Sequence, residues 1–205
     1  MLTTQKSKQI QLMLTPVKER LKGRSIEEVC KNAAIHFDPK MQEFIVPSMG
    51  KDIRITFPDF EIRQDLDMWH QLTLLQYMDT ADGTPLSGTL LSLSEMPGGL
   101  NRGRGFEKDI SLMFHRYFTN ISASEFEQCC LSAGGEILTG KADITAVIPY
   151  APRFPVTVSF WVSDEEFPAS GKVMVNAAAE HYLSLDSAGG ACASVIQELN
   201  RLRKQ

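Results

Sequence analysis

The sequence lacks the features that would commit it to a specialised class of protein. No eighteen apolar residues follow one another, so no segment is predicted to cross a bilayer as a helix. The first fifteen residues contain no apolar signal-peptide core, and we therefore expect a soluble, cytoplasmic chain. Lysine and arginine together number 21 against 25 acidic residues, a balance that attracts neither nucleic acid nor an anionic membrane.

Recognised catalytic and metal-binding motifs are also missing. The sequence has no G-x-S-x-G elbow, no P-loop and no G-x-G-x-x-G following a strand. The histidines stand far from the cysteines, and no C-x-x-C pair occurs, so we predict reduced thiols and no zinc site. No nucleophile and no cofactor is assigned on this basis, and an enzyme is not favoured. The cysteines are Cys30, Cys129, Cys130 and Cys192.

What is present is an ordinary globular composition, with 43% hydrophobic residues in 205. A chain of that length and composition favours one compact domain with a core of its own. We expect a helical segment over residues 1–24 and a single domain over 25–205. Within the first segment, a helix over 5–14 is predicted to end at Pro16 and a second to run to Lys22.

Residues 1–31 carry seven basic residues against three acidic ones. This excess has two interpretations: a contact surface for an acidic protein partner, or the solvated face of amphipathic helices, which we favour. Immediately afterwards, Ser25 and Glu28 match a capping box, in which each side chain bonds the other's backbone amide, and open a helix to about Ala34. The basic residues are Lys6, Lys8, Lys18, Arg20, Lys22, Arg24 and Lys31.

Two regions have the alternation and turn residues of antiparallel hairpins. The first spans residues 35–62, and the second contains the strands DITAVIPY, PVTVSFWV and KVMV between 143 and 175. Because strands and helices come in blocks, we predict an α+β fold: a single compact domain with mainly antiparallel sheet from two hairpin regions packed with helices. The helices are expected at about 65–79, 106–118, 123–132 and 187–203.

The glycine-rich stretch PGGLNRGRGFEKD precedes the helix predicted at 106 and carries Arg102 and Arg104. Free amides and guanidinium groups in such a loop could hold a phosphate or a carboxylate. Glu107 and Asp109 would oppose that anion, so a flexible surface loop is the favoured alternative.

The sharpest acidic feature is the turn Asp164–Glu165–Glu166, three residues beyond Trp161. Adjacent carboxylates repel one another, and a divalent cation would relieve the repulsion if their oxygens converged. Neighbouring residues in extended chain point to opposite sides, however, so at most two of the three can converge. A solvated hairpin turn is therefore favoured, and no metal ligand is assigned.

Together these features predict a ligand-binding surface that combines fixed charge, aromatic area and turn backbone. Its expected occupant is a small anionic ligand or a protein partner, with no nucleic acid and no membrane involved. The predicted ligand-binding residues are Arg102, Arg104, Arg153, Trp161, Asp164, Glu165 and Glu166.

The string PYAPRFPVTVSFWVSDEEFPASGKVMVNAAAEHYL resembles the hallmark of an uncharacterised family, the domain of unknown function numbered 3786. Three earlier stretches, RSIEEVCKNAAIHFD, LTLLQYMDTADGTPLSGTLLSLSEMPGG and GKADITAVIPY, are similar to its other blocks in the same order. The resemblance covers roughly residues 20 to 200. It implies an accessory or ligand-binding protein of anaerobic metabolism, linked to iron–sulfur or corrinoid modules, and transfers no catalytic residue.

Two alternatives remain open beside an accessory or small-ligand-binding protein. One is a metal-assisted hydrolase or transferase, in which the acidic turn acts with Glu180 or His181 from the following helical turn. The other is a structural partner-binding module that uses the basic amino-terminal segment.

Overall fold

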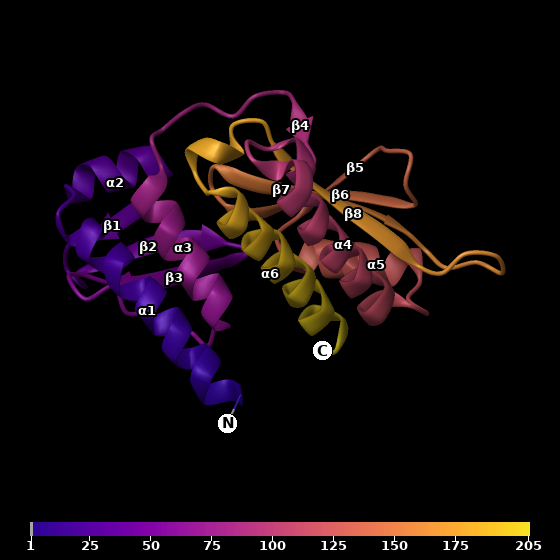
Figure 1. Ribbon diagram of the computed structural model, residues 1–205, viewed down its shortest axis with the longest axis horizontal. Helices are drawn as coiled ribbons and strands as arrows, with labels where there is room; N and C mark the ends of the chain where they lie inside the picture. The colour runs from indigo at the N-terminus through magenta and orange to yellow at the C-terminus, as the bar shows by residue number, and fades with distance from the viewer. Residues whose placement is uncertain (1) are drawn as a thin grey trace.

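The computed structural model describes residues 2–205, with side chains from residue 12 onward, and has two antiparallel sheets packed with helices (Figure 1). This confirms the predicted α+β class. The helices are α1 Leu2–Lys22, α2 Ile26–Ala33, α3 Met68–Thr80, α4 Gly99–Phe118, α5 Ala123–Ser132 and α6 Leu185–Arg203, with 3-10 turns η1 Leu93–Glu95 and η2 Ala179–His181. The strands are β1 His36–Asp38, β2 Glu43–Ser48, β3 Lys51–Thr56, β4 Leu90–Leu91, β5 Glu136–Leu138, β6 Ile144–Ala151, β7 Phe154–Trp161 and β8 Ser170–Asn176.

The amino-terminal half combines the sheet β1-β2-β3 with helices α1 to α3. Met49 and Gly50 form the tight turn between β2 and β3, and both have positive φ, +48° and +74°. Two such residues in succession match the right-handed twist of a hairpin. The amide of Met49 also donates to the carbonyl of Pro149 at 2.8 Å, which joins this hairpin to the second sheet.

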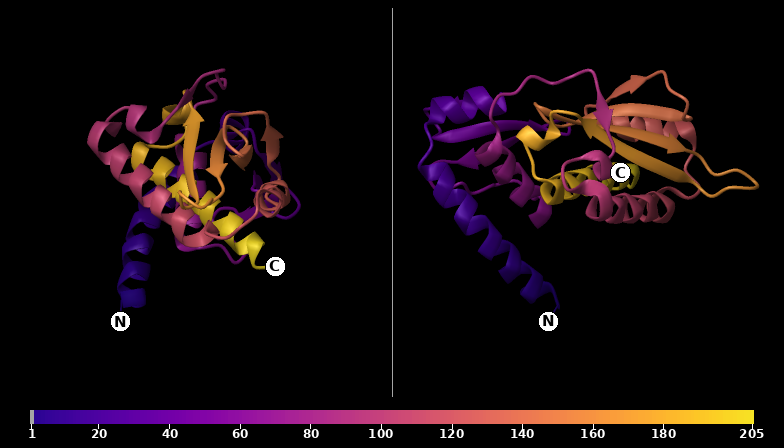
Figure 2. Two further views of the ribbon diagram at one scale, coloured as in Figure 1. Left: turned by 90° about the vertical axis from the view of Figure 1, so that its right-hand side faces the viewer. Right: turned by 45° about the horizontal axis from the view of Figure 1, so that its top comes forward.

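The carboxyl-terminal half contains the sheet β4-β8-β7-β6-β5, in which every neighbouring pair is antiparallel. Alternate residues of β6, including Ile144, Ala146 and Ile148, are buried, as expected where helices cover one face of a sheet. Helix α6 contacts α3, α4 and α5 and lies between the two halves (Figure 1). The turn between β7 and β8 projects from the end of the molecule opposite α2 (Figure 2).

Helix α4 begins at Gly99, so the glycine-rich stretch predicted as a loop forms its first two turns. The reason is the four-residue spacing of Gly99 and Gly103, which places both on the helix face that contacts η1. A Cβ on either would lie within 3.0 Å of the backbone of Leu93 or Ser94. The missing side chains therefore allow a backbone contact that offsets the low helix propensity of glycine.

Helix α1 runs through Pro16, so the predicted break at that residue is wrong. Proline removes one backbone hydrogen bond, but the helix continues because its Leu14, Val17 and Leu21 side chains are buried in contact with the rest of the core. The amino-terminal end of α1 extends away from the body of the protein (Figure 2).

The predicted capping box of α2 forms only in part. Ser25 accepts from the Glu28 amide at 3.2 Å, as expected. The Glu28 carboxylate, however, pairs with Arg24 at 2.7 Å and does not return to the Ser25 amide. The ion pair with Arg24, the residue before Ser25, thus replaces the expected bond from the Ser25 amide to Glu28.

Most of the described basic side chains near the amino terminus pair with this chain's own acids. Lys18 pairs with Glu61 and Arg20 with Asp79, at 2.5 and 2.6 Å. Both ion pairs connect α1 to later segments. They neutralise part of the positive charge that could otherwise attract an acidic protein partner. The side chains of Lys6 and Lys8 lie outside the described residues. None of the described helices is both long and apolar enough to cross a membrane.

Candidate functional site

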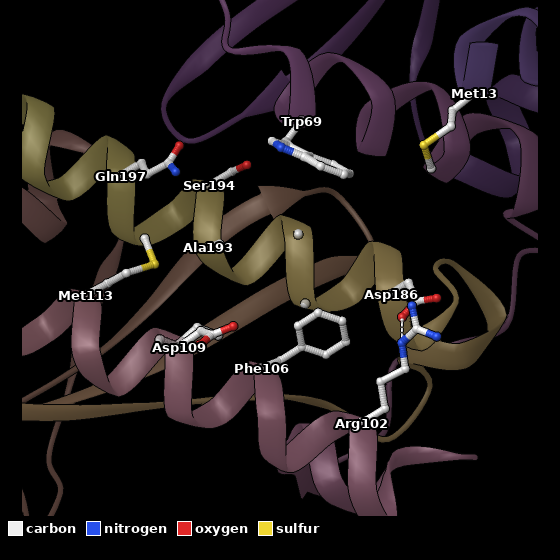
Figure 3. A pocket seen from close by; sticks show the side chains of 13 residues that line it. Met13, Trp69, Arg102, Phe106, Asp109, Met113, Asp186, Ala193, Ser194 and Gln197 are labelled. Carbon is white, nitrogen blue, oxygen red and sulfur yellow. Dashed lines mark ion pairs between the residues drawn. The ribbon is translucent and has the colours of Figure 1, made fainter. Parts of the chain in front are cut away.

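A hollow lies over α6, with α4 on one side and α3 and α1 on the other (Figure 3). Its volume is about 380 Å³, within the range of small-molecule sites. We call it the aromatic chamber. It is lined by Met13, Trp69, Arg102, Phe106, Asp109, Ile110, Met113, Asp186, Gly189, Gly190, Ala193, Ser194 and Gln197.

The floor of the aromatic chamber is hollow because α6 carries small residues there. Gly189 and Gly190 offer no side chain, and Ala193 offers one methyl group. A Cβ at Gly189 would stand 2.7 Å from the Phe106 ring, so this glycine is required for the ring to rest on the helix. Two glycines in a helix interior cost roughly 1 kcal/mol each relative to alanine. The packing of Phe106 helps to offset that cost.

The walls of the chamber are mostly apolar, with charged side chains among them, and Trp69 is the most prominent side chain. Trp69 is 49% exposed, high for the largest apolar side chain, and faces the chamber from α3 across from Phe106 and Met113 of α4 (Figure 3). Exposed aromatic area in a concave surface is typical of a ligand contact.

Ser194 is a buried polar group of the floor that bonds none of the described residues. The residue is 3% exposed, and its Oγ has no hydrogen-bond partner among the described residues. Figure 3 shows its hydroxyl directed toward the side of the chamber where Trp69 lies. A buried hydroxyl without a partner costs free energy on the order of 1–3 kcal/mol, so such groups are rare in folded proteins.

A second hollow of about 210 Å³ adjoins the first, and Ser194 and Gln197 line both. We call it the polar chamber. Its other lining residues are Met49, Lys51, Asp65, Leu66, Asp67, His70, Glu198 and Arg201.

His70 is the buried titratable group of the polar chamber. Its Nε2 lies 3.0 Å from Ser48 Oγ, and its ring lies 5.3 Å from the ring of Tyr150. Burial lowers the pKa of His70 to about 4, against a smaller opposing effect of Asp67, so the imidazole is neutral at pH 7. His115, in contrast, is exposed.

Glu198 pairs with both cations of the polar chamber. Its carboxylate accepts from Lys51 Nζ at 2.7 Å and from Arg201 Nε at 2.7 Å. Burial acts to raise the pKa of Glu198, but these two hydrogen bonds and charges outweigh it and lower the value to about 2. Asp67 caps α3 by accepting from the amides of Trp69 and His70 at 2.9 and 3.1 Å.

The structure does not bring the predicted ligand-binding residues together. Arg102 reaches the mouth of the aromatic chamber, where it pairs with Asp186 at 2.5 Å, and Arg104 is exposed on the same helix. Arg153 precedes β7 and Trp161 ends it, so these two are separated by the length of a strand, about 25 Å at ~3.3 Å per residue. A single surface that includes all of them is therefore not formed.

The acidic turn is exposed and makes its own hydrogen bonds. Asp164 Oδ1 accepts from the amides of Glu166 and Phe167 at 2.8 and 2.7 Å, which lowers the pKa of this carboxyl. Trp161 and Asp164 line a shallow hollow beside the turn, whereas Glu165 and Glu166 do not.

Glu180 and His181 lie beyond the other end of β8, about 20 Å of strand away from the turn at ~3.3 Å per residue. The predicted pairing of these residues with the acidic turn is therefore wrong, and His181 pairs with Asp82 at 2.7 Å instead. Among the side chains that the structure describes, no group of three or more His, Cys, Asp or Glu is arranged to hold a metal ion.

Sequence reasoning missed the cleft formed by the two chambers. The available signal was the run SAGGACAS inside an amphipathic helix, since small residues on one helix face leave space or allow close packing. The partners that close the space, Trp69 and Phe106, come from distant segments and could not be assigned to it.

Comparison with known proteins gives one finding. A family model described as a domain of unknown function, DUF3786, matches residues 25–198. No curated protein and no solved structure matches this chain.

Proposed function

This chain belongs to the DUF3786 family, and from that premise we propose that it is a small-ligand-binding protein whose site is the aromatic chamber. The observation that carries the proposal is the buried Ser194 hydroxyl, which lines a mostly apolar hollow and has no partner among the described residues. A ligand that bonds this hydroxyl while covering Trp69 removes two costs of the empty protein.

The favoured ligand is planar and uncharged. Trp69 and Phe106 offer flat apolar area, which a ring system covers best. Arg102 is already paired with Asp186, and Asp109 adds a second carboxylate to the lining, so the chamber has no surplus positive charge for an anion. The anionic ligand predicted from the sequence becomes one outcome of the test. The link to anaerobic iron–sulfur or corrinoid metabolism is supported by the family resemblance alone.

The test uses indole as a neutral, planar probe and the methionine methyl groups as local reporters. With ¹³C-methyl methionine in the full chain, indole should shift the signals of Met13 and Met113, which line the chamber. Met78 is buried elsewhere and Met41 is exposed elsewhere, so both should stay unchanged. For a probe of this size we expect a dissociation constant on the order of 1 mM.

Substitutions distinguish indole binding in the aromatic chamber from nonspecific binding elsewhere on the surface. Ala193→Leu fills the floor and should weaken indole binding at least tenfold, whereas Gln128→Leu adds the same side chain to exposed α5 and should leave binding unchanged. Ser194→Ala should weaken binding while raising the stability of the empty protein by about 1 kcal/mol, because it removes an unpartnered buried hydroxyl. Equal binding by the Ala193→Leu variant and the unmodified protein would refute the proposal.

A further inference from the structure

The two chambers share part of their lining along α6. Ser194 and Gln197 line both, so a ligand that extends from one chamber into the other would pass these two residues. The Ser194 hydroxyl is buried in this shared lining and has no hydrogen-bond partner among the described residues. The cleft therefore changes character along its length, from aromatic to polar.

The polar chamber has hydrogen-bonding groups, and both of its cations are paired with Glu198. Lys51 and Arg201 share the carboxylate of Glu198, and one oxygen of Asp67, Oδ1, accepts from two amides of α3. An incoming carboxylate would have to compete with Glu198 for its cations. An incoming ammonium would meet Asp65 and Asp67, which form no ion pair with a described residue, but both are exposed and solvent weakens the attraction.

His70 supplies the group that a ligand can use. Its Nε2 is engaged by Ser48, and its Nδ1 makes no hydrogen bond with any described residue. The ring is 5% exposed and faces the chamber as a neutral imidazole, since burial keeps its pKa low. A neutral imidazole nitrogen either donates or accepts one bond, and which it does depends on the tautomer.

We infer that the natural ligand is elongated, with a planar ring in the aromatic chamber and an uncharged polar tail, of amide or hydroxyl type, that passes Ser194 and bonds His70 Nδ1. This inference rests on the proposed function, because it extends the ligand from the same chamber. Amide and hydroxyl groups both donate and accept, so they fit either tautomer of His70 and the hydroxyl of Ser194. The paired cations of the polar chamber disfavour a carboxylate, and water around the exposed Asp65 and Asp67 weakens their attraction for an ammonium group.

Four indole probes test the inference on the full chain: indole, indole-3-propionamide, indole-3-propionate and 3-(3-aminopropyl)indole. The amide should bind about tenfold tighter than indole and should also shift the methyl signal of Met49, which lines only the polar chamber of the two. The two charged tails should give no such gain. A carboxylate or amine that binds as tightly as the amide, or an amide that leaves Met49 unchanged, would overturn the inference while leaving the ring site intact. Failure of indole itself to shift Met113 would overturn the proposed function.

Substitutions at His70 and Ser48 test whether His70 Nδ1 is the atom that bonds the tail of the ligand. His70→Gln places an amide near the position of Nε2, so it can keep the bond to Ser48 but loses Nδ1. It should bind indole normally and lose the tenfold gain of the amide probe. Ser48→Ala removes the other end of the 3.0 Å bond and should keep that gain. Normal indole binding shows that each variant is folded, and an unchanged gain in His70→Gln would contradict the assignment of His70.

Discussion

In the turn between β7 and β8, the carboxylate of Asp164 accepts two backbone amides of its own turn, and its neighbours face water. In the cleft over α6, the hydroxyl of Ser194 is buried and bonds none of the side chains or backbone groups that the structure describes. The turn has more charge, whereas the cleft has groups that the fold leaves unsatisfied. The comparison teaches that conspicuous charge in a sequence is often satisfied locally, and that a binding site is better recognised by what remains unpaired in a concave surface.

The largest expected effect is a loss of folding stability at low pH, which arises from His70 in the cleft and not from the acidic turn. Because the folded-state pKa of His70 is about 4, below its ordinary 6.5, the folded protein binds fewer protons than the unfolded chain between these values. Stability from this residue is complete above pH 6.5 and is lost as the pH falls, by about 3 kcal/mol at pH 4. Urea unfolding at pH 7 and pH 4 should show this loss, and His70→Gln should lack it. Parallel pH profiles for both proteins would show that the cleft does not titrate.

The second effect tests whether the glycine-rich start of α4, which forms one wall of the cleft, is a packed helix or a flexible loop. Gly103→Ala places a Cβ within 3.0 Å of the backbone of Leu93 and should destabilise the protein by about 2 kcal/mol, despite the better helix propensity of alanine. Gly105 is the matched control, since a Cβ there meets nothing within 4 Å. Gly105→Ala should stabilise the protein by about 1 kcal/mol. Urea unfolding measures both, and two variants with no effect would indicate the flexible loop.

The smallest effect is expected at the acidic turn. Glu165→Gln with Glu166→Gln should leave the melting temperature unchanged, with or without millimolar magnesium, manganese or calcium, because the described groups form no metal-binding cluster there. Asp164→Ala should lower the melting temperature at neutral pH. The folded-state pKa of Asp164 is lowered by its bonds to the Phe167 and Glu166 amides, so this difference should disappear as the pH falls through that value. A cation-dependent rise in melting temperature that the double variant loses would restore the metal site.

Sequence periodicity was sufficient for the elements whose signals are local. The three long strands β6, β7 and β8 follow from alternating β-rich residues bounded by prolines and turn residues, and α5 follows from Ser122, which caps it in reciprocal bonding with Glu125. The two-residue strand β4 has no such pattern. It is a strand only because it pairs with β8, a contact that the local sequence does not reveal. Strand β5 is likewise short and defined by its partner β6.

Helix α4 shows why composition misleads where packing decides. Four glycines between 98 and 105 indicate a loop when each is considered alone. The four-residue spacing of Gly99 and Gly103 favours a helix only because η1 packs against that face, and the sequence does not predict η1. The candidate site failed to appear for the same reason. Its aromatic wall and its glycine floor belong to three helices, and no local rule connects Trp69 with Phe106 across α6.

The position of the cleft between the two halves gives it a further consequence. Met13 and Trp69 belong to the amino-terminal half, whereas Phe106 and Ser194 belong to the carboxyl-terminal half. A molecule held by all four can stay bound only while both halves keep their native arrangement. Its occupancy would therefore tie the unfolding of one half to that of the other, and would make the protein more cooperative as a whole than either sheet with its own helices.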